Sequence, residues 1–93
     1  MTKIPIACTL DAGEQVTRRD EWVSMFGRAT ARAGSRLTFP TSVAVELADL
    51  VAREVECCAF FTFTMTVAHG EVVLEVDAPP EANELVAAFV SLA

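Results

Sequence analysis

The residues of this chain with the most distinctive chemistry are two adjacent cysteines, Cys57 and Cys58. A third cysteine, Cys8, lies near the start of the sequence. Three thiols cannot all pair within one chain, and the first residues lack the features of a secretion signal. We therefore expect reduced thiols in a cytoplasmic protein rather than a disulfide framework. Packing, metal binding and redox chemistry are the roles open to such thiols.

The charges around the cysteine pair favour a bound cation over a reactive thiolate. The pair is predicted at the C-terminal end of a helix, beside Glu54 and Glu56. Such a position disfavours a thiolate, because cysteines of low pKa occur at helix N-termini and beside basic groups. Three sulfurs without a set of nitrogen ligands fit Hg(II), As(III) or Cu(I) better than tetrahedral zinc. We predict a metal site at Cys57 and Cys58, with Cys8 as a third ligand if the topology brings it close.

No other constellation in the sequence competes with the cysteines. There is no Gly-rich phosphate loop, no serine nucleophile context and no pairing of histidine with a carboxylate. The only histidine, His69, is predicted in a hairpin turn, facing solvent. We expect a non-enzymatic domain without an organic cofactor. Two alternatives stay open: a sensory or protein-interaction module with structural cysteines, and a thiol-dependent enzyme or metal-transfer protein that uses Cys57.

Composition restricts the partners of the chain. Its 93 residues fit a single domain over 1–93, and 13 acidic against 7 basic residues give a net charge of -6. This charge opposes binding to nucleic acid phosphates, so five arginines of the first half are predicted to form a solvated helix face: Arg18, Arg19, Arg28, Arg32 and Arg36. The longest apolar run is far shorter than the ~20 residues that cross a bilayer. The hydrophobic share of 53% is high for a small domain, which makes a homodimer or a fused neighbour plausible.

Hydrophobic periodicity predicts the elements in the first part of the chain. Residues 4–10 alternate between apolar and smaller or polar side chains, which predicts a strand with Cys8 on its core side. A helix is predicted to begin after Asp11 and to stop at Gly34. Its apolar positions are Trp22, Met25, Phe26 and Ala29.

The second part of the chain is predicted to form two further helices around a hairpin. A short strand over 36–39 precedes a helix capped by Thr41 or Ser42. The apolar face of that helix holds Val43, Leu47, Leu50, Val51, Val55 and Cys58. Alternation over 61–67 and 72–76 predicts a hairpin, and Pro79-Pro80 starts a last helix.

These elements predict an α+β domain with a single sheet, in the order β-α-β-α-β-β-α, and with helices packed on one face. The topology decides whether Cys8 can join the pair. If the first two strands are antiparallel, Cys8 approaches Cys57 and Cys58, and if they are parallel it lies at the opposite end.

Three segments carry a resemblance to a known bacterial domain: Ile6-Ala-Cys-Thr-Leu-Asp, Glu56-Cys-Cys-Ala-Phe-Phe-Thr-Phe-Thr and Leu74-Glu-Val-Asp-Ala-Pro. With these segments the chain resembles, over nearly its whole length, a small cysteine-pair domain that occurs alone or appended to regulators of the MerR class. Some of those regulators are labelled as mercury or metal responsive. The resemblance implies a link to metal resistance or sensing, with a MerR-class regulator as a partner. The family pattern has a proline after the cysteine pair, where this chain has Ala59.

Overall fold

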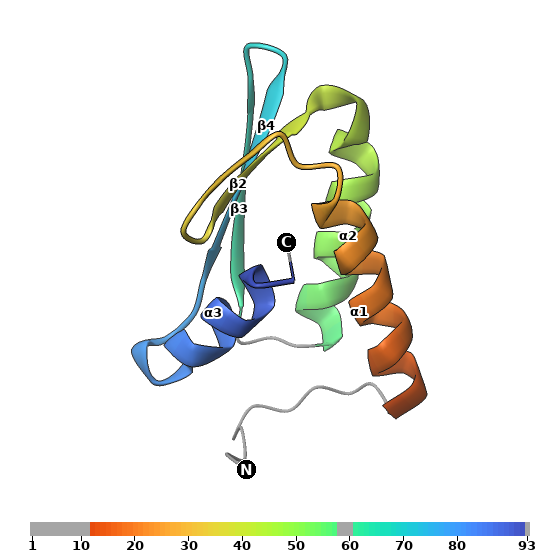
Figure 1. The fold of residues 1–93 in the computed structure, drawn as a ribbon, viewed down its shortest axis with the longest axis vertical. Helices are drawn as coiled ribbons and strands as arrows, with labels where there is room; N and C mark the ends of the chain where they lie inside the picture. Colours follow the sequence, from red (N-terminus) through yellow and green to blue (C-terminus); the bar gives the residue numbers. More distant parts are fainter. Residues whose placement is uncertain (1–11, 58–60, 93) are drawn as a thin grey trace.

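The computed structural model describes residues 12–57 and 61–92, which form three α-helices and a sheet of four antiparallel strands (Figure 1). The elements are α1 (Ala12–Phe26), β1 (Ala31–Ala33), β2 (Arg36–Pro40), a 3-10 turn η1 (Thr41–Val43), α2 (Ala44–Cys57), β3 (Thr62–Ala68), β4 (Glu71–Asp77), a 3-10 turn η2 (Pro80–Ala82) and α3 (Asn83–Val90). The α+β class is as predicted. The predicted order is not, because the described elements follow α-β-β-α-β-β-α. The predicted strand over 4–10 lies outside the described residues.

The sheet has the spatial order β1-β2-β4-β3, so β4 is central. Leu74 lies opposite Leu37 of β2 and Met65 of β3, and this row belongs to the face that packs against the helices. The next row along, Thr64 and Arg36 on either side of Glu75, belongs to the other face. The alternation that predicted the strands therefore arises because one face of the sheet is covered and the other meets solvent.

The predicted hairpin over 61–76 is confirmed. Ala68 pairs with Glu71, and the two residues between them form the turn. His69 has a φ of 55° and Gly70 a φ of 77°, as a two-residue type I′ turn requires at both positions. His69 is exposed, as predicted.

The first helix ends earlier than predicted. It stops at Phe26, and residues 31–33 turn back as β1 against β2 instead of continuing to Gly34 as helix. Gly34, with a φ of 61°, makes this turn, and the Thr30 amide donates to the Thr38 carbonyl at 2.8 Å. All three β1 side chains are exposed, so backbone pairing forms this strand without any hydrophobic pattern that the sequence could reveal.

The core is one cluster between the covered sheet face and the three helices, and its largest member is Trp22 at 1% exposure. The Trp22 ring stacks on Phe63 with 5.7 Å between centroids, and Phe89 of α3 meets it edge-on at 4.8 Å. Two predictions for the second helix are wrong. Val55 is 38% exposed, and Thr41 and Ser42 lie within η1, whose N-cap position is Pro40 without a side-chain cap.

We expect Leu74→Ala to lower the free energy of unfolding by about 2–5 kcal/mol, because Leu74 is fully buried in the central strand and its loss leaves a cavity. Urea unfolding followed by circular dichroism measures the change. Val45→Ala on α2 is the control, since Val45 is 83% exposed, and its effect should stay within about 0.5 kcal/mol. Equal effects of the two substitutions would contradict this core.

Candidate functional site

The predicted metal ligands lie at or just beyond the edge of the described chain. Cys57 is the last residue of α2, whereas Cys8 and Cys58 lie outside the described residues. Within residues 12–57 and 61–92, no three His, Cys, Asp or Glu side chains are placed to hold a metal ion together. The parts of the chain that can be compared with the predicted site are the described residues near Cys57, at the end of α2.

The helices α1 and α2 pack side by side and run in opposite directions (Figure 1). Two ion pairs agree with these opposite directions: Arg18 of α1 meets Glu54 near one end, and Arg28, two residues after α1, meets Glu46 near the other. With a rise of 1.5 Å per residue, α1 extends about 9 Å before Arg18 and α2 about 4.5 Å after Glu54. The first residue of α1 and the last residue of α2 consequently lie at the same end of the domain.

A buried carboxylate joins the two helices at this end. Glu54 is only 5% exposed, and its Oε1 accepts a hydrogen bond of 2.7 Å from the indole Nε1 of Trp22. The guanidinium of Arg18 lies 3.4 Å from the same oxygen. Both donors come from α1, so a side chain one turn before Cys57 is held by two contacts to the neighbouring helix.

The role of Glu54 was not predicted from the sequence, in which it counted only as a negative charge near the cysteines. A signal was present, because Glu54 lies seven residues after Leu47 on the same helix face as the core. A carboxylate on the apolar face of a helix requires a buried donor. Trp22, which the periodicity placed in the core, has a ring N–H that can serve as that donor.

A second set of charged contacts lies along the outer side of the α1–α2 junction. Arg53 is 2.9 Å from Glu21 of α1 and 3.0 Å from Asp49 of its own helix. The hydrogen bond to Glu21 is the main cause that raises the pKa of Arg53. At the far end, the hydrogen bond from Arg28 at 2.7 Å is the main cause that lowers the pKa of Glu46.

The five arginines of the first half do not share a helix face, contrary to the prediction. Arg18 and Arg19 are in α1, Arg28 follows that helix, and Arg32 and Arg36 are in β1 and β2. The prediction was wrong because the helix ends at Phe26. The Arg18 side chain is only 12% exposed, so it is part of the packing against α2.

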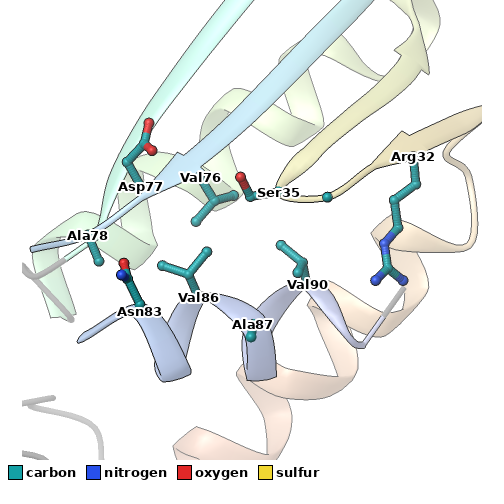
Figure 2. A pocket seen from close by; sticks show the side chains of 10 residues that line it. Arg32, Ser35, Val76, Asp77, Ala78, Asn83, Val86, Ala87 and Val90 are labelled. Atoms are coloured by element: carbon teal, nitrogen blue, oxygen red, sulfur yellow. The ribbon is translucent and has the colours of Figure 1, made fainter. Parts of the chain in front are cut away.

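A groove of about 390 Å³ lies between α3 and the sheet (Figure 2). The apolar side chains of Val76, Val86 and Val90 face one another across it, with Arg32 at one end and Asp77 near the other. Val76 and Val90 are also core residues, with 1% and 5% exposure. The groove offers apolar contact between charged ends, and its lining contains no histidine, cysteine or lysine.

A larger hollow of about 530 Å³ follows the α1–α2 junction. Its lining includes Glu21 and Asp49, which both pair with Arg53, and Arg28 and Glu46, which form the second pair. Apart from Asp20, the charged residues of this lining are in ion pairs, so the hollow is mainly an ion-paired surface of the helix junction. Neither hollow brings a nucleophile to a base.

The comparisons with known proteins add no assignment to this geometry. No family model, no curated protein and no solved structure matches the chain. None of the described helices has the length and apolar character needed to cross a bilayer.

We expect Trp22→Phe to lower the free energy of unfolding by at least about 1–3 kcal/mol, because it leaves the buried Glu54 carboxylate without its closest donor and also replaces the largest core ring by a smaller one. Unfolding is monitored by circular dichroism, because Trp22 is the single tryptophan and its substitution removes the tryptophan fluorescence signal. The control is Arg36→Gln, which removes an exposed ion pair with Glu75 and should change the free energy by at most about 1 kcal/mol. A Trp22→Phe protein as stable as the wild type would show that the bond contributes nothing.

A pH dependence follows from the exposed pair at the far end of the helices. The folded-state pKa of Glu46 lies below its ordinary value of 4.5, so the pair stabilises the fold above that pH and loses this effect as the pH falls through the folded-state pKa. We expect Glu46→Gln to be less stable than the wild type at neutral pH and equally stable in acid. Glu81→Gln, at an exposed acid, is the control for removing one negative charge. A difference that persists unchanged in acid would contradict this reasoning.

Proposed function

We propose that this protein is a non-enzymatic domain that captures a thiophilic metal ion such as Hg(II) through Cys57 and Cys58, with Cys8 as the third sulfur. The observation that carries the proposal is the antiparallel packing of α1 and α2. Because of it, the helix that follows Cys8 begins at the end of the domain where Cys57 ends α2.

Chain length supports the participation of Cys8. Three residues lie between Cys8 and Ala12, so their Cα atoms are four residue steps, or at most roughly 14 Å, apart. Packed helix axes lie about 8–10 Å apart. A thiol on this short segment can therefore reach the end of α2. It could not do so if α2 ended at the opposite end of α1.

The charges near Cys57 support a cation over a catalytic thiolate. Cys57 lies at the C-terminus of α2, where the helix dipole is negative, and the last turn of α2 contains no basic residue. Glu56 is exposed beside it, and Glu54 already accepts its bond from Trp22. In this proposal the sulfurs are the ligands, because Glu54 is already hydrogen-bonded to Trp22. The exposed Glu56 adds a negative charge nearby.

The surroundings also support a site that is held in place. Glu54 fixes α2 one turn before the pair, and the buried Phe61 fixes the chain three residues after Cys58, next to the rings of Phe63 and Phe89. Each thiol that ligates the ion releases one proton to solvent, so the affinity should rise with pH.

Within this proposal, the resemblance to the cysteine-pair domains of MerR-class regulators indicates the biological setting. The domain would act in the cytoplasm in metal resistance or sensing, with such a regulator as its partner. The charge of -6 is consistent with a role that leaves DNA contact to that partner.

The test is a titration of reduced, metal-free protein with Hg(II) against a competing small thiol. Binding is monitored by ultraviolet charge-transfer absorption and by native mass spectrometry. We expect one tightly held ion per chain, and loss of this binding in Cys57→Ser or Cys58→Ser. Cys8→Ser distinguishes three sulfurs from two, because only a three-sulfur site is weakened by it. Circular dichroism of each variant separates loss of a ligand from loss of the fold.

Two outcomes would overturn the assignment. Alkylation of the thiols that leaves Hg(II) uptake unchanged would show that the cysteines are not the ligands. Equal binding in the wild type and all three variants would show the same. The cysteines would then be structural.

A further inference from the structure

The strand β3 forms one edge of the sheet and lacks the features that protect edge strands. Among the described residues β4 is its only neighbour, and its seven residues contain no charge, proline or glycine. Native proteins commonly block a strand of this kind with lysine, proline or a bulge. An unblocked edge offers a row of backbone donors and acceptors to another strand.

The hydrogen-bond register identifies which backbone groups of β3 face this edge. The Val76 amide donates to Ser35, so the amides of alternate β4 residues from Val76 point toward β2, and those of Glu75 and Val73 point toward β3. Their partners in β3, Thr64 and Thr66, therefore face β4. The backbone groups of the residues between and beside them point outward: Phe63, Met65 and Val67.

We infer that β3 is the interface of a homodimer in which two copies pair antiparallel about a two-fold axis at Met65. This register places Met65 opposite its symmetry mate and Phe63 opposite Val67 of the other copy. Phe63, Met65 and Val67 all have outward-facing backbone groups, so each outward N–H of one copy meets an outward carbonyl of the other. The two sheets of four described strands then form one continuous sheet.

The side chains of β3 are complementary to themselves in this register. On the covered face, an aromatic ring lies opposite a β-branched residue, and on the other face Thr64 lies opposite Thr66 of the second copy, pairs that stabilise antiparallel strands. Val67 is 60% exposed in the single chain and gains Phe63 of the second copy as its neighbour. Although the chain has a net charge of -6, β3 has no charged residue, so the pairing places no like charges opposite each other.

The test introduces repulsion at exposed positions of the interface. In the double variant Thr64→Lys with Thr66→Lys, lysine lies opposite lysine twice in the dimer, while both threonines are exposed in the single chain. We expect sedimentation to give twice the 10.0 kDa chain mass for the wild type and the single-chain mass for this variant. The matched control is Ala31→Lys with Ala33→Lys, which adds the same charges at the opposite edge of the sheet and should stay dimeric.

Charge reversal provides a rescue that a folding defect cannot imitate. The variant Thr64→Glu with Thr66→Glu should be monomeric alone and should form a mixed dimer with the double-lysine variant, detected by native mass. Hydrogen exchange gives an independent readout in the full chain. The amides of Phe63, Met65 and Val67 should exchange slowly in the wild-type dimer and quickly in the lysine variant. The amides at positions 64 and 66, which face β4, should exchange slowly in both proteins.

Three results would overturn the inference. A wild-type monomer with rapid exchange at Phe63, Met65 and Val67 would mean that the edge is open. A monomer with slow exchange at these amides would mean that the chain itself covers the edge, with residues 4–10 as the occupant. A dimer that survives the lysine substitutions would place the interface elsewhere.

Discussion

The bond between the Trp22 indole and the buried Glu54 carboxylate is the interaction on which the helix layer depends. A carboxylate at 5% exposure is unfavourable unless donors reach it, and here both donors come from α1. The contact therefore allows one antiparallel register of α1 against α2. Because the same indole stacks on Phe63 of β3 and meets Phe89 of α3, the register of the helix pair is also tied to the sheet.

Two parts of the surface around this core differ in chemistry: the end of the α1–α2 pair where Cys57 lies, and the edge of the sheet formed by β3. At one end of the domain lie the first residue of α1 and the last residue of α2, Cys57. At one edge of the four described strands, β3 has no charged residue. The residues proposed for metal capture, Cys57, Cys58 and Cys8, are not among the β3 residues proposed for self-association, Phe63, Met65 and Val67.

The candidate site was only partly predictable, and the reasons are physical. The position of Cys57 at a helix end followed from local periodicity, because an amphipathic pattern stops there before an aromatic strand begins. The pairing of Glu54 with Trp22 joins residues 32 apart, and Arg18 with Glu54 joins residues 36 apart. Periodicity within a window cannot report such contacts. The same limit explains why the arginines were assigned to one helix face.

The sequence by itself determined the β3–β4 hairpin, the amphipathic α2 and the start of α3, since alternation, a His69-Gly70 turn and a proline pair act over a few residues. Only the tertiary structure decided that 31–33 form β1, because its exposed side chains carry no pattern and its backbone bonds need β2 beside it. It also decided which helix ends meet and which of the described strands lie at the edges of the sheet. Those features depend on how separate elements pack, and packing is a property of the whole chain.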